Sequence, residues 1–196
     1  MSQMFPKMYE VLKPCKCGSV EVDIMDFTRE NIPLRALMSG ISEGKFARLL
    51  VNGHVMMSET PMEHRTNREF VWDAHGDVLV GGLGLGMILL AVQDKEKVRS
   101  ITVIEKNQDV IDAVYHQLPL NQKVTLIQDD VFTWKPDRKY DCVYMDIWSY
   151  VNEDVYEEMK TLKRKYGHFL KTKEESPDRF NRCWAEYYAK SGRALL

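Results

Sequence analysis

Six residues between positions 81 and 86, Gly-Gly-Leu-Gly-Leu-Gly, have the composition of a ligand-binding loop. The apolar run DVLV precedes them, and a second apolar run, MILLAV, follows immediately. Glycines permit a tight turn and let the backbone approach a ligand closely, while the start of a helix offers unpaired N–H donors and a partial positive charge. Because the glycines stand between a predicted strand and a predicted helix, we interpret 81–86 as a nucleotide- or nucleoside-binding loop.

An acidic residue, Glu105, ends the next apolar run, SITVIEK, at about 20 residues after Gly86. Nucleotide-binding sheets place a carboxylate there, where it accepts hydrogen bonds from both ribose hydroxyls. A 2′-phosphate would be repelled at this position, which argues against a phosphorylated nicotinamide cofactor. We therefore predict that Glu105, with the adjacent Lys106, lies in a cofactor site; the alternative is a solvated glutamate at the end of a strand.

Two aspartates, Asp129 and Asp130, close the third apolar run, KVTLIQDD. Ligands of open parallel sheets bind at the carboxyl ends of the strands, so we expect this pair at the same edge as the glycine loop. One aspartate can accept a hydrogen bond from an adenine amino group while the backbone of Val131 donates to a ring nitrogen, and Phe132 or Leu83 can flank the base. One of the two aspartates could instead cap the following turn.

The fourth apolar run, YDCVYMDI, ends in Asp146, and Trp148 follows it. This position places a carboxylate opposite the glycine loop, where the reacting end of the ligand is expected. We predict Asp146 as the catalytic residue, which would act as a general base toward an amine or hydroxyl acceptor or pair with a charged substrate group. Trp148 either forms part of the substrate pocket, where its ring can contact a cation, or packs as an ordinary aromatic side chain.

A parallel sheet covered by helices would bring these residues together. From residue 77 onward, short and nearly continuous apolar runs alternate with longer amphipathic segments, which is typical of such a Rossmann-like α/β fold. Strands are predicted at 77–82, 100–106, 123–130 and 140–147, and helices after Gly86, at 109–117 and from Asn152 onward. Because the sequence after residue 150 is only helix-like, we predict that the last strands of the sheet are missing.

The N-terminal part of the chain has a different pattern. Residues 17–59 contain strand-like runs, and Asn52 and Gly53 between two apolar segments form a strong hairpin signal. A short helix is predicted at 32–40, ending at Gly40. We therefore divide the chain into a β-rich extension at 1–60 and a Rossmann-like domain at 61–196.

Composition excludes several classes of function. The chain has 196 residues, 44% of them hydrophobic, and a net charge of −2, so it can form one core but lacks the basic surface that nucleic acid requires. No run approaches the roughly 20 apolar residues of a membrane span, and no signal peptide is evident, so we expect a cytoplasmic protein with a small-molecule substrate. Four scattered cysteines indicate reduced thiols, and no metal site is expected.

The motifs VLVGGLGLG, VIEKN, QDDVF and YDCVYMDIW together resemble the successive motifs of class I S-adenosylmethionine-dependent methyltransferases. In detail they resemble the spermidine synthase branch, over roughly residues 46–148. Upstream, RLLVNGHVMMSETPMEH is similar to the segment of that branch in which a hairpin precedes an acidic pair at the mouth of the active site. Glu63 stands in the acidic position, which implies a role in substrate binding.

The resemblance implies S-adenosylmethionine, or its decarboxylated form, as the cofactor. It also implies the roles of individual residues: Gly82, Gly84 and Gly86 cradle the nucleoside, Glu105 holds the ribose, Asp130 contacts adenine, and Asp146 occupies the position of the catalytic acid.

Three functions agree with this resemblance. The first is a transferase, similar to methyltransferases, that acts on a small nucleophilic acceptor. The second is an aminopropyltransferase, although Leu85 and Thr66 stand where that branch has an Asp and a Tyr. The third is a protein that binds or degrades S-adenosylmethionine without transferring a group. Because an incomplete sheet leaves an edge to be covered, a homo-oligomer is also plausible.

Overall fold

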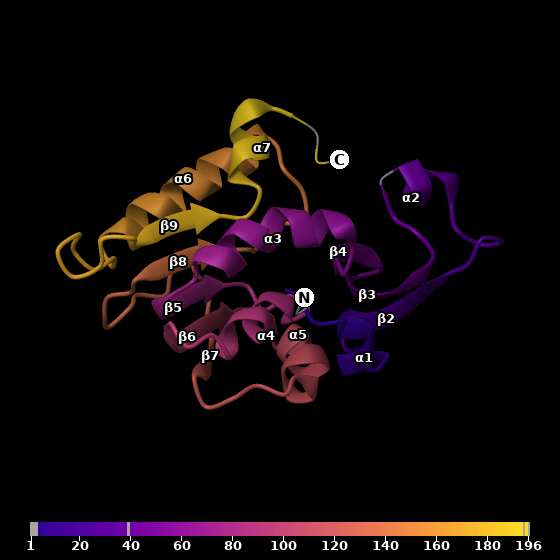
Figure 1. Ribbon diagram of the computed structural model, residues 1–196, viewed down its shortest axis with the longest axis horizontal. Coiled ribbons are helices and arrows are strands. Elements are labelled where there is room, and N and C mark those ends of the chain that lie inside the picture. The colour runs from indigo at the N-terminus through magenta and orange to yellow at the C-terminus, as the bar shows by residue number, and fades with distance from the viewer. Residues whose placement is uncertain (1–3, 39, 194, 196) are drawn as a thin grey trace.

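The central sheet has five parallel strands in the order β7-β6-β5-β8-β9 (Figure 1). The computed structural model describes residues 4–38, 40–193 and 195. The strands are β5 (Gly76–Gly81), β6 (Val98–Glu105), β7 (Val124–Gln128), β8 (Cys142–Met145) and β9 (Phe180–Cys183). The α/β class and the four strands predicted from apolar runs are confirmed.

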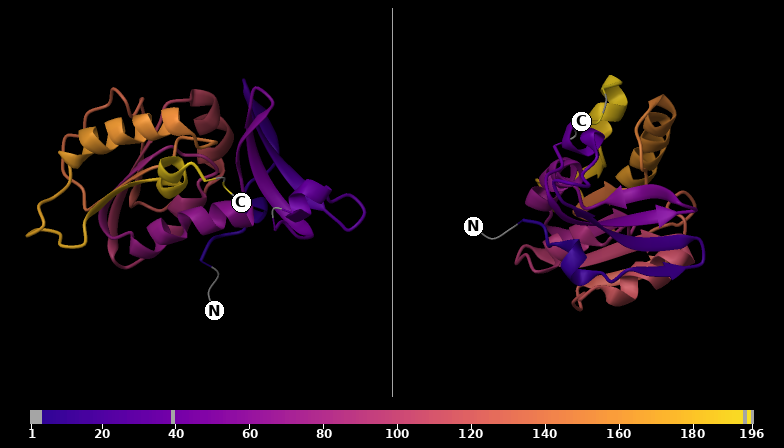
Figure 2. Two further views of the ribbon diagram at one scale, coloured as in Figure 1. Left: turned by 90° about the horizontal axis from the view of Figure 1, so that it is seen from above. Right: turned by 90° about the vertical axis from the view of Figure 1, so that its right-hand side faces the viewer.

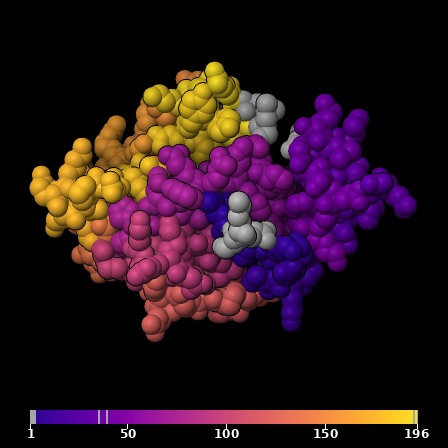
Figure 3. Space-filling view, in the orientation of Figure 1, coloured from indigo at the N-terminus to yellow at the C-terminus, as the bar shows by residue number. Residues whose placement is uncertain are grey.

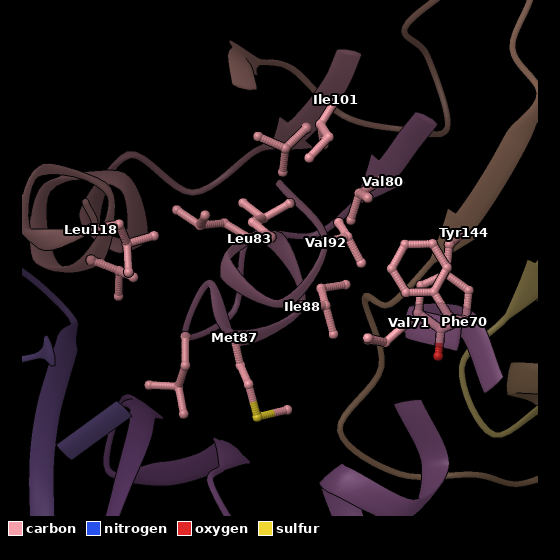
Figure 4. Packing of buried hydrophobic residues seen from close by; sticks show 14 of the residues in the cluster. Phe70, Val71, Val80, Leu83, Met87, Ile88, Val92, Ile101, Leu118 and Tyr144 are labelled. Atoms are coloured by element: carbon pink, nitrogen blue, oxygen red, sulfur yellow. The ribbon is translucent and has the colours of Figure 1, made fainter. Parts of the chain in front are cut away.

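Helices cover both faces of this sheet, which is why its strands are apolar on both sides. Val80 of β5 packs in a core with the helices α3 (Pro61–Asp73), α4 (Met87–Gln93) and α5 (Gln108–Val114). Leu79, on the other face, packs with α6 (Glu153–Gly167). In the first core, the rings of Phe70 and Tyr144 stack at a centroid distance of 4.2 Å (Figure 4).

The fifth strand, β9, corrects one prediction. It pairs in parallel with β8, with Phe180 opposite Cys142 and Cys183 opposite Met145. Only the two end residues of this strand are buried, and the polar Asn181 and Arg182 lie between them. The sequence therefore lacks the apolar run that marks the other strands. The prediction that only helices follow residue 150 is therefore wrong. After β9 the described chain continues into α7 (Glu186–Ser191), with no closing hairpin in the residues described.

Helix α3 was not predicted. Its buried side chains include Glu63 and Asn67 as well as Phe70 and Val71, so polar residues interrupt the apolar stripe that normally reveals a helix. Pro61 stands in the first turn, where the missing N–H costs nothing.

The N-terminal segment folds into an antiparallel sheet in the order β1-β2-β3-β4. The short helix α1 (Met8–Val11) precedes this sheet, and its Met8 packs in the same core as Val80 of β5. The predicted hairpin is confirmed: Asn52 and Gly53 have φ angles of 51° and 78°, as the tight turn between β3 and β4 requires. The short helix predicted before Gly40 is present as α2 (Leu34–Met38). The strands are β1 (Cys15–Cys17), β2 (Val20–Phe27), β3 (Gly44–Val51) and β4 (His54–Ser58).

Hydrogen bonds join the turn between β1 and β2 to a helix that covers the parallel sheet. The backbone N–H and the hydroxyl of Ser19 donate to Asp109 of α5 at 2.8 and 2.9 Å, and the 3₁₀ turn η1 (Tyr115–Gln117) continues that helix. The N-terminal sheet stands beside the carboxyl ends of the parallel strands (Figure 2). The domain boundary at residue 60 stays a prediction, since buried residues of both sheets belong to one core. No described helix is both long and apolar enough to span a membrane.

Four charged side chains meet at the amino edge of the parallel sheet, opposite the glycine loop. Lys171 Nζ lies 2.7 Å from Asp77 and 2.8 Å from Asp141, and Arg99 contacts the same two carboxylates at 2.8 and 2.7 Å. Burial alone would raise the pKa of each aspartate, but several hydrogen bonds together outweigh it, so both pKa values lie below their usual range. Arg99, Lys171 and Ser100 donate to Asp77, whereas Lys171 and the backbone N–H of Asp77 donate to Asp141. The cluster ties the starts of β5 and β8 to the segment after α6.

We expect Lys171→Met to lower the free energy of unfolding by about 2 to 3 kcal/mol at pH 7, because it leaves Asp141, only 6% exposed, with one cation. The two aspartates have lowered pKa values, so their stabilising effect is complete above the unfolded Asp pKa of about 4 and is lost as the pH falls further. Urea unfolding at pH 7 and pH 3 checks this. Because both aspartates keep lowered pKa values in the folded protein, the loss should shrink only in part at pH 3. The exposed Lys173→Met is the control; an equal loss in both variants, or a loss that is larger at pH 3 than at pH 7, contradicts the prediction.

Candidate active site

A cavity of about 280 Å³ lies at the carboxyl edge of the parallel sheet, between the strand ends and the N-terminal sheet. The view from above in Figure 2 shows β3 and β4 standing across that edge. The lining residues come from both sheets and from α3: Leu49, Val51, Met56, Met57, Glu63, Gly82, Gly84, Ile104, Glu105, Lys106, Asn107, Val110, Asp129, Asp130, Val131, Phe132, Asp146, Ile147 and Trp148.

Most of the residues predicted for cofactor or substrate binding line this one cavity. They are Gly82, Gly84, Glu105, Lys106, Asp129, Asp130, Val131, Asp146, Glu63 and Trp148. Two predicted residues are not in the lining. The Leu83 side chain is buried in the core, and a Cβ at Gly86 would point at Leu118, so both lie on the side of the loop that faces away from the cavity.

The glycine loop is shaped by two close contacts. Gly82 has φ of 95°, and a Cβ there would lie 2.2 Å from the carbonyl oxygen of Asp146, so this position requires glycine. Gly84, with φ of 52°, faces the sulfur of Met57, which also accepts a hydrogen bond from the Leu85 N–H at 3.4 Å. The loop is therefore fixed on one side by β8 and on the other by β4.

Glu105 is held in place by the backbone. One carboxylate oxygen accepts a hydrogen bond from the Leu83 N–H and the other from the Asn107 N–H, both at 2.9 Å. Each carboxylate oxygen has two lone pairs, so one acceptor site per oxygen remains available. The carboxylate joins the glycine loop to the start of α5 and still presents two acceptors, which is the arrangement that a diol needs.

The turn after β7 is formed by the second aspartate. Asp130 accepts a hydrogen bond from the Phe132 N–H at 2.8 Å, and its other oxygen lies 3.9 Å from Lys106. The turn-capping alternative thus describes Asp130 in this structure. On the side of this turn that faces α6, Tyr166 and Lys165 donate hydrogen bonds to the carbonyl oxygen of Val131 at 2.8 and 2.9 Å. The backbone that flanks the cavity is therefore rigidly held.

Two carboxyl groups stand together at the other end of the cavity. Glu63 of α3 is 5% exposed, and Asp146 follows β8, where its N–H donates to Gly81 at 2.8 Å. Burial raises the pKa of Glu63 to about 8, and the nearby charge of Asp146 adds to this shift; burial also raises the pKa of Asp146 to about 7. Near neutral pH the pair thus holds about one proton between its two members.

A buried network holds Glu63. The amide nitrogen of Asn67 donates to the backbone oxygen of Glu63 at 3.1 Å and to its carboxylate at 3.4 Å, and Tyr144 donates to the Asn67 side-chain oxygen at 2.9 Å. Sequence reasoning missed this network because α3 was not predicted. The spacing of Glu63 and Asn67 by four residues, which places them on one helical face, was the available signal.

The remaining walls are apolar and aromatic. Trp148 lines the cavity and donates its indole N–H to Glu158 of α6 at 2.7 Å, so its ring is anchored. Met56 and Met57 of β4 contribute the opposite wall, and neither was predicted. The strand-like alternation of HVMM predicts a hairpin but does not reveal which sheet its side chains will face.

Solved structures with a similar backbone trace include three that each align with 57% of this chain. The DhpI–SAH complex is 22% identical with a TM-score of 0.43 over 50% of that chain. The N-methyltransferase NodS from Bradyrhizobium japonicum WM9, in complex with S-adenosyl-L-homocysteine (SAH), is 15% identical with a TM-score of 0.44 over 58% of that chain. The CcbJ methyltransferase from Streptomyces caelestis is 18% identical with a TM-score of 0.44 over 46% of that chain.

The aligned part of this chain thus spans about half the length of those solved chains, and a similarity at this level says nothing about substrates. None of the three is described as an aminopropyltransferase, and they lend no support to the spermidine synthase branch. No protein-family model and no curated protein matches the sequence.

Proposed function

We propose that this chain is an S-adenosylmethionine-dependent transferase, similar to methyltransferases, that acts on a small nucleophilic acceptor. One observation carries the proposal: a single cavity has a pre-oriented carboxylate for a diol at one end and a carboxyl pair, the buried Glu63 and the half-buried Asp146, at the other. A nucleoside that carries a reactive group on its 5′ side would span the cavity from one end to the other.

The residues of the cavity fit the donor. The two available acceptor sites of Glu105 would take the ribose hydroxyls. Val131 and Phe132 provide apolar surface for the base, and Asp130, fixed by its turn, provides an acceptor for the adenine amino group. Gly82 and Gly84 leave room above the loop, and the amino-acid end of the donor would extend toward Asp146. The same fit applies to the decarboxylated donor.

When bound, the donor supplies an electrophilic carbon on a sulfonium: the acceptor's lone pair forms the new bond and the carbon–sulfur electron pair remains on sulfur. The chain's own residues must position the acceptor and remove its proton. Asp146 in its ionised form can accept that proton, while Glu63 in its protonated form can donate a hydrogen bond to the acceptor. Trp148 and the two methionines of β4 restrict water.

The carboxyl pair favours an amine as the acceptor, since the negative charge of Asp146 would attract an ammonium group. The ammonium must then pass a proton to Asp146 before its nitrogen lone pair can form the new bond. This observation keeps the aminopropyltransferase as a second candidate. Against it stand Leu85, which is fully buried, and Thr66, whose hydroxyl accepts the indole N–H of Trp184 at 3.0 Å. Release of methylthioadenosine in the presence of decarboxylated donor and several amines would support this candidate, and its absence leaves methyl transfer.

Isothermal titration with S-adenosylmethionine and SAH tests the proposal. We expect both to bind with a Kd in the micromolar range, about −8 kcal/mol, because the cavity encloses most of a nucleoside. NADPH serves as the control, since its 2′-phosphate would be repelled by Glu105, and it is expected not to bind. Absence of binding for both adenosyl compounds at millimolar concentration would refute the proposal. Binding without turnover of any acceptor would favour the third function, a protein that only binds the donor.

A further inference from the structure

Tyr144, Asn67 and Glu63 form a buried chain of hydrogen bonds that begins at β8 and ends at the carboxyl pair. The ring of Tyr144 stacks on Phe70 in the core (Figure 4), and Asn67 is fully buried. Asn67 lies one helical turn after Glu63, so the two side chains share one face of α3. Such a chain is held in one arrangement, because each bond that is not made leaves a desolvated polar group.

The partners of Asn67 fix which way its amide group points. Tyr144 donates its phenol proton to the side-chain oxygen of Asn67 at 2.9 Å. Burial and the nearby charge of Asp146 raise the pKa of this phenol well above its usual value, so it remains a donor. The amide nitrogen faces the backbone carbonyl oxygen of Glu63 at 3.1 Å, and a carbonyl oxygen can only accept. Both contacts require the same orientation, which points the NH₂ group of Asn67 toward Glu63.

The amide of Asn67 also contacts the carboxyl group of Glu63. Its nitrogen lies 3.4 Å from the carboxyl oxygen Oε2. The indole N–H of Trp184, which donates to Thr66 at 3.0 Å, lies near the same carboxyl group and lowers its pKa. Because an N–H donor binds the ionised form of a carboxyl group more strongly, these contacts oppose the effect of burial on the pKa of Glu63.

One charge dominates the surroundings of Glu63. Within the residues that the structure describes, Asp146 is the charged group that shifts the pKa of Glu63. Burial raises the pKa of Tyr144 on β8 and raises that of Cys183 on β9 to about 12, so both stay neutral near pH 8. The exposed Glu69 of α3 is paired at the surface. Changes in the titration of Glu63 therefore report on Asp146 and on the hydrogen-bond donors.

The chain lies in the wall between two cavities. The second cavity, of about 440 Å³, is bordered by α3, the end of β9 and α7, and Tyr188 is part of its lining. Figure 3 shows the yellow C-terminal segment against the magenta surface of α3. Tyr144 lines this second cavity, whereas Asn67 and Trp184 line neither and are buried. Glu63 is thus covered on the side of α7, and it lines the first cavity.

We propose that Asn67 is a positioning residue for the transfer reaction: oriented by Tyr144, it holds carboxyl oxygen Oε2 of Glu63 and turns the other oxygen toward Asp146 and the acceptor. This inference rests on the proposed transferase function. The oxygen that Asn67 leaves free holds the shared proton of the pair, and from there Glu63 donates its hydrogen bond to the acceptor.

The test follows the carboxyl carbons of Glu63 and Asp146 by ¹³C NMR of ¹³C-labelled protein between pH 5 and pH 10, with signals assigned through Glu63→Gln and Asp146→Asn. Asn67→Leu keeps the approximate size of the side chain and removes its donors. We expect the pH at which the pair loses its last proton to rise by about 0.5 to 1 unit, or about three- to tenfold in proton affinity. A loss of stability alone would not move this titration.

Tyr144→Phe keeps the amide but removes the group that orients it, so we expect a smaller shift in the same direction. In the double variant the shift should equal that of Asn67→Leu, because Tyr144 acts through Asn67. Asn181→Leu is the matched control. Its amide donates to the carbonyl oxygen of Lys163 at 2.9 Å, on the α6 side of the sheet, and its loss should leave the titration unchanged.

An unchanged titration in Asn67→Leu, an equal shift in Asn181→Leu, or summed shifts in the double variant would each overturn the inference. If Asn67→Leu does not fold, Tyr144→Phe decides, since an unchanged titration there shows that Tyr144 does not act on Glu63. Titration of SAH into the same variants tests the transferase function separately, and donor binding should be unchanged because Glu105 is intact. If SAH does not bind the unsubstituted protein, the proposed function fails, whereas the carboxyl titration still reports whether Asn67 holds Glu63.

Discussion

Asp146→Asn is expected to lower kcat at saturating donor by about 10²- to 10³-fold, the usual contribution of a general base. Asparagine keeps the shape of the side chain, and the backbone bond from residue 146 to Gly81 is unchanged, so the cavity should persist. In the unsubstituted protein, kcat should rise with pH through about 7, because the ionised form of Asp146 is the base and its pKa is raised to about 7. The variant should lose this rise.

Glu63→Gln is the matched variant. It keeps Asp146, so we expect a smaller loss, of about tenfold, with the pH-dependent rise retained near the same pH. A steady-state pH profile of all three proteins, with donor binding measured by titration, separates catalysis from binding. If Asp146→Asn kept more than a third of the activity, or kept the pH-dependent rise, Asp146 would not be the base.

The raised pKa values also affect the stability of the folded protein, and this effect does not depend on the reaction. Asp146 and Glu63 have folded-state pKa values above those of the unfolded chain, about 4, so the pair costs no stability below pH 4 and progressively more as the pH rises toward 8. The Tm of Asp146→Asn should therefore exceed that of the unsubstituted protein at pH 8. The difference should shrink toward pH 5.

The fold could be predicted from sequence where burial and apolarity coincide. Strands β5, β6 and β8 are apolar on both faces because helices cover both, and they read as continuous apolar runs. Strand β9 and helix α3 failed this test for one physical reason. In both elements polar side chains interrupt the apolar pattern. In β9 these are the half-buried Asn181 and Arg182, and in α3 they are the buried Glu63 and Asn67, whose hydrogen-bond partners the sequence does not reveal. β9 extends the sheet by one strand and is itself an edge strand, so the homo-oligomer stays a prediction.

The candidate site was predictable at the strand ends. Parallel strands bring their carboxyl ends to one edge, so the positions of Glu105, Asp130 and Asp146 follow from topology alone. The side chains that come from other elements could not be predicted in this way. Met57 and the cavity beside Tyr188 depend on how the N-terminal sheet and α7 pack, and Glu63 was placed by resemblance before its helix was known.

Glu105→Gln is expected to weaken donor binding by about 100-fold. The unsubstituted carboxylate accepts from Leu83 and Asn107 and retains one acceptor per oxygen for the ribose, and hydrogen bonds to charged groups are worth about 1.5 to 3 kcal/mol each. Glutamine offers one oxygen and one NH₂ group. The NH₂ would face a backbone N–H donor, so one loop contact and one ribose bond are lost together.

Titration of SAH into Glu105→Gln, Glu105→Asp and the exposed control Glu96→Gln measures the effect. Glu105→Asp keeps the charge but shortens the side chain, so its loss should lie between those of the other two variants. Glu96→Gln makes the same chemical change in a turn at the opposite edge of the sheet and should leave the Kd within twofold. Equal affinities for Glu105→Gln and Glu96→Gln would show that the nucleoside does not lie on Glu105. The orientation that places the reactive carbon beside Asp146 would then have to be abandoned, because that orientation is fixed by the ribose.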